Sequence, residues 1–193
     1  MGAAPVAKLS VEEYLALDRA AEVKSEYHDG ELFPLEAVTW SHARISFRFA
    51  VLLDRHLTKT GCQVVPSSLR VRVSPAKFVI PDVLVVCGKL EFTDEHNDTI
   101  TNPKVIVEVL SPSTADYDYG GKFNLYRRLP SLEEYVLISQ DQARVETFRK
   151  TPGNEWVLHT YEGLDATVTI KCLGVSVPLR EAYEGVALTA GNE

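Results

Sequence analysis

Two short runs of Val, Ile and Leu, each interrupted by a carboxylate, constrain the fold of this chain most strongly. Residues 80–86 read IPDVLVV and residues 105–110 read VIVEVL. This composition is typical of central strands that are buried on both faces. An ionised carboxylate is costly there unless a partner compensates its charge. Asp82 and Glu108 on neighbouring strands would also repel each other, which favours a cation between them. Mg2+, a hard ion that prefers oxygen ligands, meets this requirement.

Each carboxylate also has a plainer interpretation. Asp82 follows Pro81, and a proline ordinarily stands at a strand start or a bulge, so Asp82 could be a turn residue. Glu108 shares a face with Ile106 and Leu110 by alternation, so it could instead form a structural salt bridge to an arginine.

Length and charge limit the remaining possibilities. The 193 residues suffice for a core, and we expect a single domain over 1–193. The net charge of -7 argues against indiscriminate nucleic-acid binding, so a DNA contact needs a local basic patch or bound metal. We find no membrane-spanning apolar run and no signal sequence, and we expect a cytoplasmic protein.

The three cysteines lack the close spacing of a zinc or redox motif. Cys62 and Cys87 stand among valines, so we expect small buried hydrophobic residues and no disulfide.

The hydrophobic periodicity predicts an α/β fold, with a mixed central sheet flanked by helices and additional antiparallel strands. A capping-box pattern at Ser10 and an Asp-Gly turn at 29–30 support the first two elements. The expected helices cover about 11–20, 42–58, part of 121–129 and 178–184. The expected strands cover the hairpin 26–33 and the segments 69–73, 78–87, 105–110, 134–139, 144–149, 156–161 and 167–172.

Pro81-Asp82 followed by Glu108-Val109-Leu110 resembles the core motif of the PD-(D/E)XK nuclease superfamily. Leu110 stands where that motif has its lysine. Because variants of the superfamily carry the lysine on the following helix, Lys122 is the candidate.

The ordered series of motifs resembles the Uma-two family, restriction-endonuclease-like bacterial proteins of that superfamily, over about residues 8–185. The motifs are Glu26-Tyr27-His28-Asp29-Gly30-Glu31, Ser41-His42, Pro81-Asp82, Glu108-Val109-Leu110-Ser111-Pro112-Ser113, Lys122, Tyr126 and Glu134-Tyr135-Val136-Leu137-Ile138.

The resemblance implies a metal-dependent endonuclease that hydrolyses phosphodiester bonds, with DNA as its substrate. Asp82, Glu108 and the carbonyl of Val109 would hold Mg2+ or Mn2+, and Glu31 would complete the site. Lys122 would orient the attacking water or stabilise the transition state. Alternatively, Glu31 is an exposed hairpin carboxylate, and Lys122, which follows two glycines, lies in solvent.

A catalytically inactive binding or assembly module on the same scaffold is the alternative function, favoured by Leu110 and by the acidic net charge. A homodimer is expected by analogy with proteins of the same fold.

Several further residues are candidates for the same site. His42, at the start of a long helix, is ordinarily a packing or hydrogen-bonding residue. Asp116 and Asp118 are ordinarily acids at a helix N-terminus. The candidate phosphate-binding residues are Arg127, Arg128, Arg44 and Arg48, for which a solvated helix face is the alternative.

Overall fold

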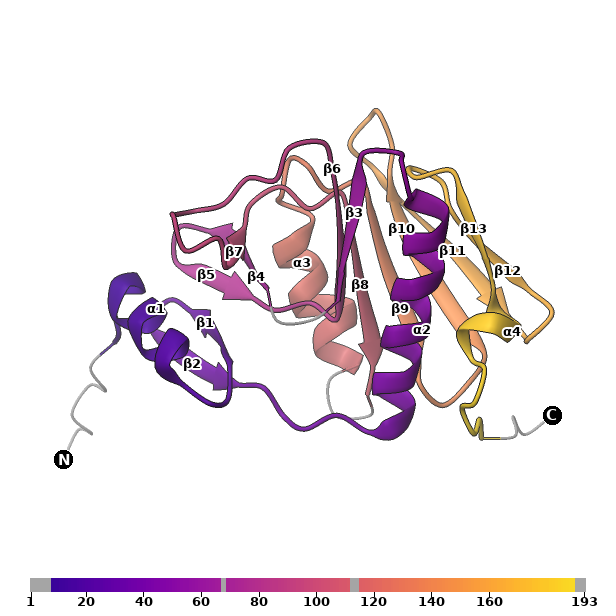
Figure 1. Ribbon diagram of the computed structural model, residues 1–193, viewed down its shortest axis with the longest axis horizontal. Helices are drawn as coiled ribbons and strands as arrows, with labels where there is room; N and C mark the ends of the chain where they lie inside the picture. Colours follow the sequence, from indigo (N-terminus) through magenta and orange to yellow (C-terminus); the bar gives the residue numbers. More distant parts are fainter. Residues whose placement is uncertain (1–7, 67–68, 112–114, 190–193) are drawn as a thin grey trace.

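The computed structural model describes residues 8–66, 69–111 and 115–189. Its central feature is a mixed sheet of six strands in the order β11-β10-β9-β8-β6-β3, flanked by α2 and α3 (Figure 1). In this sheet β8 is antiparallel to β6 and parallel to β9. The strands are β3 (Cys62–Pro66), β6 (Val83–Cys87), β8 (Val105–Leu110), β9 (Glu134–Ser139), β10 (Arg144–Lys150) and β11 (Trp156–Glu162).

Two smaller sheets complete the fold. One has the order β2-β1-β5-β4-β7 and the other pairs β12 with β13. Their strands are β1 (Ser25–His28), β2 (Glu31–Pro34), β4 (Arg70–Ser74), β5 (Lys77–Val79), β7 (Thr99–Ile100), β12 (Thr167–Ile170) and β13 (Val175–Pro178). The helices are α1 (Val11–Ala20), α2 (Trp40–Leu57), the π-helix η1 (Tyr117–Lys122), α3 (Phe123–Tyr126) and α4 (Leu179–Ala182).

Local signals set the first elements as predicted. Ser10 and Glu13 form the capping box of α1. Asp29 and Gly30 have φ angles of 51° and 101°, the left-handed values that a tight turn between β1 and β2 requires. Thr39 caps α2 by accepting a hydrogen bond from the His42 N–H, so this helix begins two residues earlier than predicted.

Both faces of the central strands are buried, as their composition predicts. On one face Val83, Val85 and Val107 pack with the apolar stripe of α2, which includes Ile45 and Phe49. On the other face Leu84 and Ile106 pack with Tyr126 of α3 and with Leu137. Glu108 alternates with Ile106 and Leu110, so its side chain belongs to the α3 face.

The strand predicted over 78–87 is divided between two sheets. Its first part is β5 and its second part is β6, and Ile80-Pro81-Asp82 joins them. Pro81 has no N–H to donate to a ladder, which explains the break. The helical turns begin before the predicted Gly121, with η1 starting at Tyr117, and the strands β3, β7 and β13 were not predicted. The predicted break at Ser111–Thr114 lies mostly outside the described residues.

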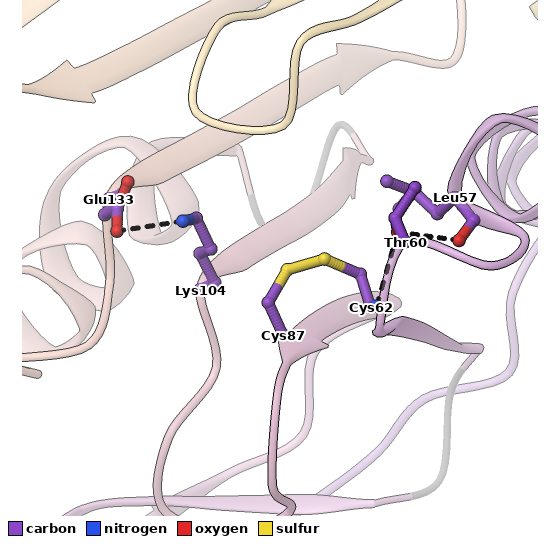
Figure 2. The surroundings of a disulfide bond; sticks show 6 residues. All are labelled: Leu57, Thr60, Cys62, Cys87, Lys104 and Glu133. Carbon is purple, nitrogen blue, oxygen red and sulfur yellow. Dashed lines mark hydrogen bonds and ion pairs between the residues drawn. A yellow bond between two sulfur atoms is a disulfide. The ribbon is translucent and has the colours of Figure 1, made fainter.

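The prediction that the cysteines form no disulfide is wrong. Cys62 and Cys87 form one, and Cys172 is free (Figure 2). The cause is the register of β3 against β6, which places Cys62 directly opposite Cys87 with their Cα atoms 3.9 Å apart. Sequence spacing alone does not reveal such a register.

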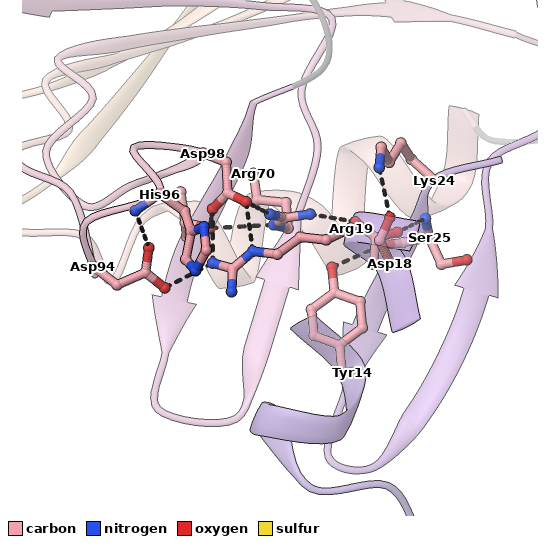
Figure 3. Close-up of polar contacts among 10 residues, drawn as sticks. Tyr14, Asp18, Arg19, Lys24, Ser25, Arg70, Asp94, His96 and Asp98 are labelled. Atoms are coloured by element: carbon pink, nitrogen blue, oxygen red, sulfur yellow. Dashed lines mark hydrogen bonds and ion pairs between the residues drawn. The ribbon is translucent and has the colours of Figure 1, made fainter. Parts of the chain in front are cut away.

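Arg70 of β4 alternates with the apolar residues Leu69 and Val71, a pattern that favours a solvated face, but it is only 3% exposed. It pairs with Asp18 of α1 and with Asp98 just before β7 (Figure 3). Arg19 of α1 also binds Asp98, with Nε 2.8 Å from Oδ2, and binds Asp94 at 2.7 Å. This ion-pair network ties α1 to the sheet that contains β4 and β7.

Within the described residues, no helix has both the length and the apolar character that a bilayer crossing needs.

Candidate active site

A cleft of about 560 Å3 lies where the β1–β2 hairpin, the start of α2, the end of β8 and η1 meet. The segment 33–39, which joins β2 to α2, forms one wall. The titratable side chains that line the cleft are Glu26, Glu36, His42, Asp82, Glu108, Tyr117, Asp118 and Lys122. Asp82, Glu108 and Lys122, the three predicted catalytic residues, therefore line one cleft.

Asp82 is fixed by partners on both of its carboxylate oxygens. The antiparallel register pairs Val83 with Val107, which places Asp82 beside the Glu108 end of β8. The Val109 N–H donates a hydrogen bond of 2.7 Å to Oδ2. The His42 Nε2 lies 2.8 Å from Oδ1. His42 thus contacts a candidate ligand, in keeping with a hydrogen-bonding role.

Glu108 is 3% exposed and has two partners from the helical turns that follow β8. The Tyr126 hydroxyl donates a hydrogen bond of 2.8 Å to Oε1, and the Lys122 Nζ lies 3.1 Å from the same oxygen. Burial raises the pKa of Glu108 to about 8. Lys122 opposes this effect, while the nearby Asp82, Asp118 and Glu26 add to it. The partner of Glu108 is therefore a lysine and not the arginine of the plainer interpretation.

Lys122 lies among three carboxylates. Besides Glu108, its Nζ is 3.4 Å from Glu26 Oε1 and 3.6 Å from Asp118 Oδ1. Burial acts to lower the pKa of Lys122, but Glu108, Glu26 and Asp118 outweigh it and raise that pKa well above its usual value. Lys122 is thus a buried ammonium group. It does not lie in solvent.

The donor set fits Mg2+ or Mn2+ that is bound with the help of substrate and water. Within the described residues, no group of three or more His, Cys, Asp or Glu side chains is arranged as a ready metal cage. Mg2+ does not need such a cage, because proteins commonly bind it through one or two carboxylates while it keeps several waters. Among the described residues that line the cleft, five carry a carboxyl group (Glu26, Glu36, Asp82, Glu108 and Asp118) and one is a lysine, so the lining is acidic and rich in oxygen ligands.

A family model described as "putative restriction endonuclease" matches residues 11–180. This match covers most of the chain. The chain belongs to the Uma2 family.

The chain is also similar to two proteins of known sequence and to one of known structure. The uncharacterized protein slr1290 of Synechocystis sp. is 35% identical over 95% of this chain and 96% of its own. The uncharacterized protein sll1609 of the same organism is 34% identical over 83% of this chain and 91% of its own. A crystal structure from Anabaena variabilis, described as a "putative nuclease belonging to DUF820", has a TM-score of 0.71 at 18% identity. The match covers 91% of this chain and 97% of the Anabaena chain. This likeness confirms the predicted fold class.

This Uma2 protein does not bring all predicted residues to the cleft. Glu31 is exposed on β2 and is not among the lining residues. Arg127 and Arg128 are exposed just after α3. The guanidinium groups of Arg44 and Arg48 bind α4 and the segment just after it. Arg44 Nε donates to the Glu184 carbonyl and Arg48 Nε to the Glu181 carbonyl, at 3.1 and 3.0 Å.

Glu26 and Gln140 line the cleft but were not predicted as site residues, and Asp118, which also lines it, was interpreted as an acid at a helix N-terminus. All three are at most 5% exposed. Two signals pointed toward them. Asp118 and Lys122 have the i,i+4 spacing of a helical ion pair. Glu26 opens the hairpin motif that the Uma2 family shares. Gln140, just after β9, carries no comparable signal.

Proposed function

We propose that this protein is an endonuclease that uses Mg2+ or Mn2+ to hydrolyse phosphodiester bonds in DNA. The supporting observation is the convergence of Asp82, Glu108 and Lys122 in one cleft, with Glu108 and Lys122 in direct contact. Membership of the Uma2 family, described as "putative restriction endonuclease", supports the same reaction class.

In this proposal Asp82, Glu108 and the Val109 carbonyl hold the ion. A bound divalent cation supplies Lewis-acid activation of the phosphate and neutralises negative charge. The His42 imidazole and the Val109 N–H keep the Asp82 carboxylate in a fixed orientation. The Tyr126 hydroxyl does the same for Glu108. These contacts preorganise the oxygen ligands before substrate arrives.

Lys122 takes the role that a lysine at position 110 has in the superfamily motif. Leu110 is 9% exposed and packs in the core with residues such as Tyr126, so it contributes no charged group to the cleft. The Lys122 ammonium reaches Glu108 from the following helical turn. From there it would orient the attacking water, or donate to a phosphate oxygen as charge develops.

The reaction is tested by cleavage of supercoiled plasmid and single-stranded DNA in Mg2+ and in Mn2+. The Glu108→Gln variant, purified in parallel, keeps the shape of the side chain but removes its charge. We expect cleavage by the wild type and none by the variant. Equal cleavage by both proteins would assign the activity to a contaminant and contradict the proposal.

A catalytically inactive binding module is the second candidate. The specific observation in its favour is that the Lys122 ammonium already pairs with the carboxylates that would hold a metal. Stabilisation by Mn2+ without cleavage of any DNA would favour this module over the nuclease.

A further inference from the structure

Two partly exposed aromatic rings stand at the acidic cleft and have no role in the proposed hydrolysis. Phe33 of β2 is 48% exposed and Tyr117 of η1 is 39% exposed, and both line the cleft. The His28 ring connects them. It meets the Phe33 ring edge-to-face at 5.2 Å, and its Nε2 lies 3.2 Å from the Tyr117 hydroxyl. Neither Phe33 nor Tyr117 belongs to the buried core.

The position of Phe33 follows from the register of the hairpin. Phe33 pairs with Glu26 across the two strands, so the two side chains share one face of the sheet. Glu26 is the carboxylate that contacts Lys122. Phe33 is therefore the cross-strand neighbour of a carboxylate that contacts Lys122.

The Tyr117 ring is held by a glycine. A Cβ atom at Gly121 would lie 2.4 Å from Tyr117 Cδ2 and 2.5 Å from Cε2, so the ring packs against the bare backbone at this position. The Lys122 Nζ is 6.0 Å from the centre of the same ring. These contacts orient an exposed ring in advance, and π-helical turns such as η1 are frequent at functional sites.

The charge of the cleft points to the class of ligand. Among the described residues that line it, Lys122 is the one lysine and there is no arginine. Binding of duplex DNA depends on Lys and Arg side chains that neutralise phosphates, and this cleft offers little of that. Single-strand sites ordinarily combine basic groups with aromatic rings, and the stacking of an unpaired base on a ring tolerates any sequence. The exposed rings, which could stack an unpaired base but not a paired one, therefore favour a single strand in this cleft.

We propose that Phe33 and Tyr117 form a stacking platform for an unpaired base beside the scissile phosphate. The substrate class is then single-stranded nucleic acid. This inference rests on the proposed nuclease function.

The test is equilibrium binding of a short fluorescent oligonucleotide, measured by anisotropy both in EDTA and in Ca2+, so that a contact that needs a bound cation can form, with cleavage checked on a gel. The same sequence is offered single-stranded and as a duplex. We expect the single strand to bind more tightly to the wild type. Phe33→Leu and Tyr117→Leu keep an apolar side chain but lose the ring, and each should weaken single-strand binding roughly tenfold. Phe47→Leu is the matched control, because Phe47 is 57% exposed on α2 and does not line the cleft.

A pair of glycine variants tests the platform without removing either ring. Gly121→Ala should displace Tyr117 and weaken single-strand binding. Gly120→Ala should not, because a Cβ atom at Gly120 meets nothing within 4 Å. Thermal melting of each variant verifies that it is folded.

Tighter binding of the duplex, or Phe33→Leu and Tyr117→Leu variants that bind as Phe47→Leu does, would overturn the inference. Cleavage assays with Glu108→Gln separate this failure from failure of the nuclease proposal. Glu108-dependent cleavage with a duplex preference would refute the stacking platform alone. Single-strand binding that needs both rings, without any cleavage, would refute the nuclease alone.

Discussion

At the scale of single residues, the cleft is defined by an ammonium group that lies among carboxylates. Burying a charge is costly, and pairing with an opposite charge offsets much of that cost. One ammonium group, that of Lys122, is shared by three acidic side chains, Glu108, Glu26 and Asp118. In the proposed function a divalent cation would add positive charge at this position.

Replacing Lys122 by Met should therefore destabilise the protein strongly. Removing one partner of a buried ion pair leaves an uncompensated charge, which costs about 3–5 kcal/mol. Urea denaturation in EDTA measures the loss. The control is Lys104→Met, which breaks the more exposed pair with Glu133 and should cost less than about 1 kcal/mol. Equal losses in the two variants would refute the buried ion pair.

The sequence indicates Asp82 and Glu108 well because a carboxylate in an apolar run is unusual wherever that run folds. It does not distinguish Glu26 from Glu31, since both are carboxylates in one hairpin. The distinction comes from register and tertiary packing. Glu31 stands opposite His28 beside the turn, whereas Glu26 stands farther along β1 and accepts a hydrogen bond from the Ile80 N–H at 3.1 Å. Neither fact can be derived from local propensity.

At the scale of elements, β6 pairs antiparallel with two strands, and each pairing determines one feature of the molecule. The two features lie at opposite ends of β6. Pairing with β8 places Asp82 beside Glu108, and pairing with β3 places Cys87 opposite Cys62. β3 is an edge strand of the six-stranded sheet. The disulfide therefore links the edge strand β3 covalently to β6, with which β3 otherwise shares only one ladder of backbone hydrogen bonds.

Reduction of this disulfide should lower the free energy of unfolding. The bond closes a loop with a sequence separation of 25, for which chain entropy predicts a stabilisation of about 3 kcal/mol. Denaturation with and without a phosphine reductant measures the difference, and Cys172→Ser serves as the background that retains the bond. Thiol titration of unfolded, unreduced protein should find one reactive thiol. Three reactive thiols would contradict the bond.

Sequence periodicity identifies most of the elements but not how they share sheets. The cap at Ser10 and the Asp-Gly turn are local signals, so α1 and the hairpin are predicted closely. The division of 78–87 between β5 and β6 is a tertiary event, in which the chain leaves one sheet at Pro81 and enters another. The burial of Arg70 likewise depends on Asp18 and Asp98, which are distant in sequence.

At the scale of the whole molecule, the ion-pair network of Asp18, Arg19, Arg70, Asp94 and Asp98 connects the N-terminal elements to the rest of the fold (Figure 3). The β1–β2 hairpin, which supplies Glu26 and Phe33 to the cleft, pairs with β5 in the same sheet as β4. The network thus stabilises the wall of the cleft from a distance.

This network should make stability sensitive to acid. Hydrogen bonds from Arg19, together with Arg70, hold the pKa of Asp98 well below its usual value. Because the folded pKa is depressed, the stabilisation is complete above the unfolded pKa, about 4, and is lost as pH falls below it. In the Asp98→Asn variant, the melting temperature should fall less steeply between about pH 4 and pH 2 than it does in the wild type. Asp165→Asn, which alters an exposed pair with Arg180, should keep the wild-type profile. Identical profiles for all three proteins would contradict this account.

The predicted homodimer also belongs to this scale and stays a prediction, which sedimentation equilibrium would test. The acidic net charge of -7 makes a bound cation important for any contact between the cleft and a phosphate.

The most direct test of the account is calorimetric titration of Mn2+ into the wild type, Glu108→Gln and Glu134→Gln. Glu134 is the matched control, a glutamate on β9 that is 1% exposed and does not line the cleft. We predict that the wild type and Glu134→Gln bind Mn2+ alike, while Glu108→Gln binds at least about tenfold more weakly. Equal binding by Glu108→Gln and the wild type would contradict the central claim that this cleft is a metal site.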